Sequence, residues 1–413
     1  MKKFKILVIL LSATILFVLY LSFRDIEDHP IKAENVLILD DQGQEFLKQL
    51  KIAKRKRPLD NFSPRVLLLS QFRTGSTFVG EIFNKNPDIF YLWEPLVCVP
   101  HNETLARNSF SKYIRDLCNC EFSKASASCL GNQREIIHST GVAALCRRVT
   151  GVYGVECPLA TPHIFHNQCV KSSGNIAMKV TQIGLDQIKN VVEESNINVK
   201  IIHLVRDPRG TANSRHFFMM TPEEKRNFKN SIEKQQNGTG VKSLKEMGYF
   251  DDLLLIPEEL RIDQLCEWTH LNLQGALRQP KWLHNRYMLL RVEDFIQDPV
   301  KTAQDIYSFI GIPVSSPVLE WLEKLLIVTS SEEVSQLSNE ASMFFPRKNF
   351  ADIATKWRKY TKFSDVLETQ RVCGDVMKML GYDFITSEEE LRNVEIKVIR
   401  ELPFDIKMKL GKK

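Results

Sequence analysis

Downstream of residue 63 the chain alternates between short apolar runs and segments whose apolar residues recur with a helical period. Short apolar runs bounded by polar or turn residues are typical of buried strands. Such runs lie at 66–69, 89–92, 176–180, 199–205 and 287–292. Strands that alternate with helical segments, such as the two predicted near 299–310 and 317–327, indicate an α/β fold with a central parallel sheet flanked by helices.

A polar loop joins the first predicted strand to a helix. This loop consists of Arg73, Thr74, Gly75, Ser76 and Thr77. Apolar residues then recur at helical spacing over 78–83 until Asn86-Pro87 ends the helix. The backbone N–H groups and the positive dipole end of such a helix start bind anions, and the guanidinium group of Arg73 adds charged donors for phosphate or sulfate oxygens. The alternative for this segment alone is an ordinary strand-to-helix turn.

The second predicted strand leads to a carboxylate, Glu94, immediately before Pro95. In a parallel sheet the carboxyl ends of the strands share one edge, where ligands of α/β proteins bind. Pro95 should restrict the backbone of Glu94 to an extended shape and so aim its side chain out of the sheet edge. Glu94 is therefore predicted to face a ligand held by the first loop. The alternative is that Glu94 only pairs with Arg73 and holds the loop.

The strand at 199–205 leads into a second candidate anion site. It is followed by Arg206 and a turn over 207–210, and the next residues predict a helix that brings Ser214 back toward the turn. A guanidinium group and a hydroxyl group together suit a terminal phosphate. The alternative is that Arg206 and Asp207 only pair with each other and cap the helix.

The N-terminal residues predict a membrane anchor. Residues 6–23 carry no charge, and three lysines precede them while acidic residues follow. A span of this length lies at the short end of those that cross a bilayer, and the positive-inside rule keeps residues 1–5 in the cytosol. We therefore expect a signal-anchor at 6–23, a stem at 24–63 and a lumenal domain at 64–413. The alternative, a cleaved signal peptide, lacks a small-x-small site at the end of the apolar run.

Charge and cysteine content narrow the class of protein. A formal net charge of +6 is compatible with an acidic glycan or a nucleotide as the ligand. Basic and aromatic residues are not interleaved along the sequence, which argues against a nucleic-acid partner. In the lumen, disulfides are the default for the nine cysteines, and the odd number leaves one thiol free or paired between the chains of a homo-oligomer. The sequence contains no paired Cys-x-x-Cys motif of the kind that would indicate a zinc site. Asn102 and Asn237 fit the N-glycosylation pattern better than Asn61, whose sequon precedes Pro64.

The two candidate anion sites also carry a family resemblance. Residues 73–84 (Arg-Thr-Gly-Ser-Thr-Phe-Val-Gly-Glu-Ile-Phe-Asn) and 90–96 (Phe-Tyr-Leu-Trp-Glu-Pro-Leu) resemble the opening of the Golgi carbohydrate 6-O-sulfotransferases. Residues 205–215 resemble their site for the 3′-phosphate of PAPS (3′-phosphoadenosine 5′-phosphosulfate). The similarity runs from about Arg65 to the C-terminus. It implies a P-loop-like sulfotransferase fold, PAPS as the sulfate donor, and a type II protein of the Golgi membrane.

The resemblance also implies roles for the site residues. Sulfuryl transfer depends mostly on positioning and on stabilising the charge that develops on the leaving group. Arg73 and the loop through Phe78 would bind the 5′-phosphosulfate, and Arg206 and Ser214 would bind the 3′-phosphate. Glu94 would take the proton from the acceptor hydroxyl as general base. This scheme requires no divalent metal.

The predicted function is sulfate transfer to the 6-hydroxyl of a galactose or N-acetylhexosamine residue in a glycan or glycosaminoglycan. The stretches 277–283, 286–289 and 387–393 resemble the keratan and chondroitin enzymes more than the N-acetylglucosamine enzymes, which remain an alternative. A non-catalytic, membrane-anchored glycan-binding protein on the same fold is a second alternative. A P-loop kinase is excluded, because the Gly-x-x-x-x-Gly-Lys-Ser/Thr pattern is absent from the sequence.

Some positions depart from the family pattern. Trp93 stands where the family has a smaller residue, and Gln182 stands where many members carry an arginine. Val292 replaces the usual aromatic residue, so the strand at 287–292 is interpreted as core rather than chemistry. Residues 356–358 match the family's Lys-Trp-Arg near the cofactor, and the alternative there is a helix start with an anchoring tryptophan.

Overall fold

The computed structural model describes residues 63–99, 106–132, 139, 141, 160–181, 183–194, 197–220, 261–327, 352–404 and 406. The predicted tail and span, and all but the last residue of the stem, lie outside these ranges, as do Asn61, Asn102, Gln182 and Asn237. Across the described ranges, no helix is both long enough and apolar enough to cross a membrane.

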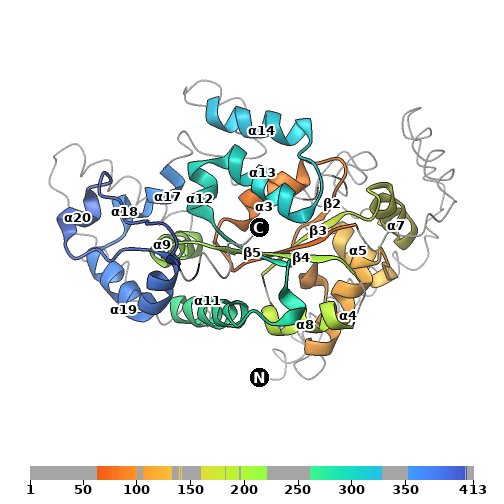
Figure 1. The fold of residues 1–413 in the computed structure, drawn as a ribbon, viewed down its shortest axis with the longest axis horizontal. Coiled ribbons are helices and arrows are strands. Elements are labelled where there is room, and N and C mark those ends of the chain that lie inside the picture. Colours follow the sequence, from red (N-terminus) through yellow and green to blue (C-terminus); the bar gives the residue numbers. More distant parts are fainter. Residues whose placement is uncertain are drawn as a thin grey trace, which may run out of the picture. The chain divides into compact units, whose positions relative to one another are not determined.

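A five-stranded parallel sheet lies at the centre of the fold (Figure 1). In the spatial order β2-β3-β1-β4-β5, its strands are β1 Arg65–Leu69, β2 Phe90–Leu92, β3 Ile176–Val180, β4 Val199–Val205 and β5 Tyr287–Arg291. These bounds confirm the predicted strands to within a residue at either end. The last strand stops at Arg291 because Val292 already begins a helix.

Helices cover both faces of this sheet. One face packs against α3 Ser76–Asn84, α12 Val292–Gln297, α13 Pro299–Ile310 and α14 Ser316–Ile327. The other face packs against α4 Ala106–Cys118, α5 Lys124–Asn132, α7 Pro162–Lys171, α8 Leu185–Glu193, α11 Ile262–Leu277 and α19 Phe363–Leu380. The remaining elements are α9 Pro208–Met219, α17 Asp352–Thr355, α18 Trp357–Tyr360, α20 Glu388–Arg392 and the 3-10 helices Pro95–Cys98 and Lys281–Leu283.

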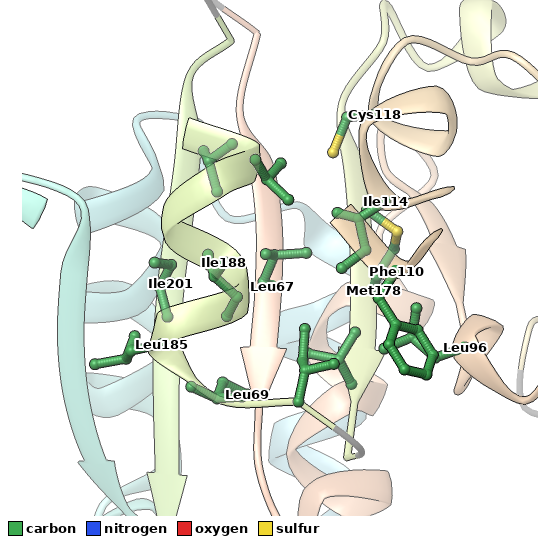
Figure 2. Close-up of a cluster of buried hydrophobic side chains, with 14 of the residues drawn as sticks. Leu67, Leu69, Leu96, Phe110, Ile114, Cys118, Met178, Leu185, Ile188 and Ile201 are labelled. Atoms are coloured by element: carbon green, nitrogen blue, oxygen red, sulfur yellow. The ribbon is translucent and has the colours of Figure 1, made fainter. Parts of the chain in front are cut away.

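The apolar runs of the sequence become strands, and β1, β2, β3 and most of β4 are buried on both faces. Successive side chains of a strand point to opposite sides of the sheet. Figure 2 shows Leu67, Met178 and Ile201 in one buried cluster with Ile188 of α8 and Ile114 of α4. Their neighbours in sequence pack into the other layer. Burial on both faces is typical of parallel sheets and explains why the strands read as continuous apolar runs.

The strand order positions the site. Strands β1 and β2 follow each other in the sequence, but β3 lies between them in the sheet, and β4 lies on the other side of β1. Ligands of open parallel sheets bind beyond the carboxyl ends of the strands, where the order of the strands reverses. The loops after β1, β2 and β4 and the end of β3 therefore meet at one edge.

Disulfides join most of the described cysteines. The bonds link Cys98 to Cys129, Cys120 to Cys169 and Cys266 to Cys373, which confirms the prediction of disulfides for these residues. Cys118 is buried and free, and burial raises the pKa of its thiol to about 12. Its thiol therefore stays protonated at neutral pH. Cys146 and Cys157 lie outside the described residues.

Candidate active site

The loop between β1 and α3 turns at two residues with a left-handed backbone. Arg73 has a φ of 69°, and Gly75, the N-cap residue of α3, has a φ of 89°. A left-handed conformation strains a residue other than glycine, and such strain is common at functional sites. Gly75 brings no side chain to the helix start, so the first amide groups of α3 face the loop. This backbone matches the anion-binding helix starts of other α/β proteins.

The side chains of the loop have different environments. Thr74 is buried, and its Oγ1 donates to the carbonyl of Gln71 at 2.7 Å. Ser76 is buried at the first position of α3. Phe78 packs against Phe295 and Trp321, with ring centroids 5.4 and 5.7 Å away. The backbone of this loop, more than its hydroxyl groups, is therefore the part that suits an anion.

Gly75→Ala is expected to destabilise the protein more than Gly311→Ala. A left-handed alanine costs about 1–2 kcal/mol at either position, because their φ values are 89° and 83°. A Cβ at Gly75 would also lie 2.8 Å from Cγ2 of Val292, whereas a Cβ at Gly311 meets no atom within 4 Å. Thermal unfolding of both variants measures the difference. Adding Val292→Ala should recover part of the loss, and equal melting temperatures for the two single variants would contradict this steric role.

Arg73 joins the two predicted anion sites. Its Nε donates to Oγ of Ser214 at 3.1 Å, and a guanidinium nitrogen of Arg206 donates to the carbonyl of Arg73 at 3.2 Å. A second guanidinium nitrogen of Arg206 donates to the carbonyl of Ile353 at 3.1 Å. Because β1 and β4 are neighbours, their loops meet. The structure thus brings Arg73, Arg206 and Ser214 together: the guanidinium group of Arg73 contacts Ser214, and that of Arg206 contacts the backbone of Arg73.

Buried polar groups fix the turn after β4. Asp207 caps α9, and its carboxylate forms an ion pair with Arg209 at 2.7 Å. Glu293 accepts from the backbone N–H of Asp207 at 3.0 Å and from the hydroxyl of Tyr382 at 2.8 Å. Asp207 caps the helix as the alternative supposed, but its ion-pair partner is Arg209 rather than Arg206. Burial lowers the pKa of Arg206, and the carboxylates of Glu293 and Asp207 oppose that shift.

Glu94 forms an ion pair with Lys179 of β3. The Nζ of Lys179 lies 2.6 Å from Oε1 of Glu94, and their side chains are 5% and 15% exposed. The same Nζ donates to Oγ1 of Thr77 at 3.0 Å and lies 4.5 Å from the centroid of the Trp93 ring. Burial lowers the pKa of Lys179, and the charge of Glu94 opposes that shift. Lys179 therefore connects Glu94 to the first turn of α3.

The structure contradicts one expectation about Glu94 and the alternative given for its pairing. Its backbone is left-handed, with φ 40° and ψ 54°, rather than extended, because the chain turns directly into the 3-10 helix Pro95–Cys98. Its ion-pair partner is Lys179 rather than Arg73, because β3 separates β1 from β2. Both corrections make Glu94 a strained carboxylate that faces a buried cation.

Sequence reasoning missed Lys179 and Glu293. The signal for Lys179 is a single cation inside the apolar run 176–180, since lysines are almost never fully buried unless they are paired. Glu293 directly follows the strand at 287–292 that is interpreted as core, and no role was predicted for it. The structure buries both residues, but Glu293 supports the turn at Asp207. A buried carboxylate that accepts two hydrogen bonds is a positioning group for that turn.

The segment at 356–358 matches the alternative of an anchoring tryptophan. Trp357 begins α18, is 2% exposed, and its ring centroid lies 4.8 Å from the guanidinium carbon of Arg209. Arg358 is also buried and donates to the carbonyls of Leu391 and Ile396. Both side chains therefore stabilise the elements beside the second anion site.

The described residues define an α/β protein whose sheet carries, at its carboxyl edge, a helix start and arginine side chains suited to an anionic ligand. Residues 63–381 match the family model of the sulfotransferase domain, so the chain belongs to this family. This match confirms the sulfotransferase assignment that the sequence motifs predicted.

Similar proteins include carbohydrate sulfotransferase 1 of Rattus norvegicus, which is 28% identical over 377 residues that cover 82% of this chain and 84% of the relative. Carbohydrate sulfotransferase 3 of Mus musculus is 28% identical over 366 residues, which cover 81% of this chain and 71% of the relative. Among solved structures, the sulfotransferase domain from the curacin biosynthetic pathway aligns with a TM-score of 0.37 at 17% identity, covering 76% of this chain and 97% of that one. That likeness is too distant to bear on the site.

Proposed function

We propose that this protein transfers the sulfuryl group of PAPS to a hydroxyl group of a carbohydrate. Membership of the sulfotransferase family supports the reaction and the donor, and relatives named carbohydrate sulfotransferase 1 and 3 support the acceptor class. The observation that carries the proposal is the hydrogen bond between Arg73 and Ser214. It joins a loop suited to a phosphosulfate with a helix suited to a second phosphate, and PAPS presents two such groups.

Each anion position has its own donors. Arg73 and the backbone N–H groups at the start of α3 hold the 5′-phosphosulfate, and the loop through Phe78 lies against the nucleotide. Arg206 and Ser214 hold the 3′-phosphate. Support for these roles is the hydrogen bond from Arg206 to the carbonyl of Arg73, together with the buried ion pair that fixes the turn following Arg206.

Glu94 and Lys179 act on the acceptor side. The acceptor oxygen attacks sulfur in line with the leaving phosphate oxygen, and Glu94 takes the hydroxyl proton as the new O–S bond forms. The S–O bond to the phosphate breaks, and the negative charge passes to PAP (3′-phosphoadenosine 5′-phosphate). Arg73 and the loop amides stabilise that charge, and Lys179, placed between Glu94 and Thr77, stabilises the sulfuryl oxygens during transfer.

Removing a donor of the second anion position should weaken PAP binding. Arg206→Ala and Ser214→Ala should each lose roughly 1–3 kcal/mol of binding free energy, the value of a charge-assisted hydrogen bond. Arg371→Ala, which removes a 71% exposed guanidinium group from α19, is the matched control and should bind PAP normally. Calorimetric titration with PAP and with ADP measures both effects. Equal affinity of the wild type for PAP and ADP would contradict this assignment.

The domain organisation belongs to the same proposal. Residues 6–23 anchor a type II protein whose catalytic domain, residues 64–413, lies in the Golgi lumen. We expect a C-terminal tag on microsomal protein to resist protease until detergent is added, and Asn102 or Asn237 to carry glycans. Digestion of the tag without detergent would refute this topology. Cleavage after residue 23 in the mature protein would support a signal peptide instead.

The acceptor is proposed to be the 6-hydroxyl of galactose or an N-acetylhexosamine in a keratan or chondroitin chain. Radiolabelled PAPS with a panel of desulfated glycans, followed by disaccharide analysis, tests the sugar and the position. Incorporation into N-acetylglucosamine of other glycans alone would assign the protein to that related class.

A further inference from the structure

Two aromatic rings beside Arg73 have no role in the chemistry above. Phe72 and Phe218 pack edge to face, with centroids 4.9 Å apart and planes at 79°. The guanidinium carbon of Arg73 lies 5.8 Å from the centroid of Phe72 and 5.5 Å from that of Phe218. Phe218 is 46% exposed. A large aromatic side chain that stays exposed next to a catalytic arginine is typical of a binding surface.

The pair is fixed to the site from two directions. Phe218 lies four residues after Ser214 in α9, so both side chains share one face of that helix. Arg215, which is 2% exposed, donates to the carbonyl of Phe72 at 3.2 Å and to that of Arg261 at 3.0 Å. Phe72 itself directly precedes Arg73 in the β1 loop. The two rings therefore form a preorganised surface, here called the aromatic platform.

The platform and the nucleotide loop lie on different layers of the protein. Phe78 packs with Phe295 and Trp321 in the layer of α3, α12 and α14. Helix α9, which carries Phe218, packs against α11 and α19 of the opposite layer. An adenine base beside Phe78 would therefore leave the platform to another ligand. A pyranose ring suits it, because one face of the ring presents C–H groups to an aromatic surface and its hydroxyl groups can accept from Arg73.

The width of the sheet edge indicates which sugar binds there. Glu94 follows β2, and Phe218 lies on the helix that follows β4. The ring of Phe218 packs on Phe72 in the loop after β1, and two strand spacings of about 4.8 Å separate β1 from β2, so Glu94 and the platform lie on the order of 10 Å apart across the edge. This span exceeds a single sugar ring. We infer that Phe72 and Phe218 bind a second sugar of the acceptor chain, a neighbour of the one that is sulfated; the inference rests on the proposed carbohydrate acceptor.

Kinetics with acceptors of two lengths test the platform. With an oligosaccharide acceptor, Phe218→Ala should raise KM about tenfold, while kcat and the Kd for PAP stay within about twofold. Phe218→Trp keeps an aromatic surface and should restore most of the affinity. Phe384→Ala removes another exposed phenylalanine, 39% accessible, and should change nothing. With a monosaccharide glycoside as acceptor, Phe218→Ala and the wild type should have the same KM.

The outcomes of these experiments distinguish a failure of the second-sugar site from a failure of the proposed function. An equal rise in KM for the monosaccharide, or no rise for the oligosaccharide, would overturn the second-sugar site. A loss of PAP affinity in Phe218→Ala would show that the ring only positions Arg73, and would overturn it as well. If the wild type sulfates no glycan, the proposed function fails, and the platform is tested by titrating a desulfated oligosaccharide into the PAP complex. In that titration Phe218→Ala should weaken binding about tenfold, and unchanged affinity would overturn the inference.

Discussion

Replacing Glu94 by glutamine should lower the turnover number by roughly 10²–10⁴-fold, the usual size of a general-base effect. Glutamine keeps the length and the hydrogen bonding of the side chain but cannot accept the proton of the acceptor hydroxyl. The affinity for PAP should stay nearly unchanged, because its proposed donors lie on the loops after β1 and β4, whereas Glu94 follows β2. Steady-state kinetics and titration with PAP measure the two quantities on the same preparation.

The ion pair with Lys179 adds a second expected effect. Glu94→Gln removes the charge that opposes the burial of Lys179, so the pKa of Lys179 should fall further and the melting temperature should drop modestly. Glu81→Gln on α3 is the control, because it neutralises a carboxylate that is 20% exposed and lies 3.6 Å from Lys85. That variant should retain full turnover. A Glu94→Gln enzyme with more than about a tenth of the wild-type turnover would remove Glu94 from the role of base.

Local patterns predicted the elements of the fold because the forces that form them are local. Each apolar run that is buried on both faces became a strand, and the helices at 299–310 and 317–327 begin and end within a residue of their predicted bounds. The order of the strands depends instead on packing between distant segments. Nothing in the spacing of 66–69 and 89–92 indicates that the run at 176–180, about eighty residues further on, inserts between them. The pairing of strands is non-local. A period-two pattern determines which face of a strand is buried, but it does not determine which strand lies beside it.

The same distinction between local and non-local effects applies to the residues of the predicted site. Arg73, Arg206 and Ser214 were predicted from local motifs, and the structure brings them together through adjacent strands. The ion pair of Glu94 with Lys179 was not predicted, because its partner depends on which strand lies beside β2. Lys179 was not predicted for the same reason. A single lysine in an apolar strand is significant only when a carboxylate from the adjacent strand faces it, as Glu94 does here. The acceptor surface could not be predicted, because Phe72 and Phe218 meet only in three dimensions.

Replacing Lys179 by methionine should lower turnover by about 10²–10³-fold, the size of losing one preorganised group that stabilises developing charge. Methionine fills the same volume without the ammonium group. The change also leaves Glu94 without its ion-pair partner, and breaking a buried pair from one side costs about 3–5 kcal/mol, less here because Glu94 is 15% exposed. Lys200→Met on β4 is the control, because β1 separates β4 from β3 and Lys200 donates to the carbonyl of Asn285 away from the site.

The pH dependence provides a second measurement of Lys179. Burial holds the pKa of this lysine below its usual value of 10.5, and the ammonium group exists only below the folded-state pKa, so turnover should fall as pH rises through that lowered value. Stability has the opposite sign. Between the folded-state pKa and 10.5 the unfolded chain binds more protons, so the free energy of unfolding should rise with pH across this window.

Lys179→Met should abolish the fall in turnover and weaken the pH dependence of stability. Lys200→Met should leave the turnover profile in place and change only stability, because burial lowers the pKa of Lys200 as well. The double variant Lys179→Met/Glu94→Gln separates stability from catalysis, because it removes both charges of the pair at once. We expect it to regain much of the stability that Lys179→Met loses and to remain as inactive as Glu94→Gln. If Lys179→Met instead loses stability but keeps its turnover within about threefold of the wild type, the ammonium group serves only to hold Glu94, and its proposed action on the sulfuryl oxygens is wrong.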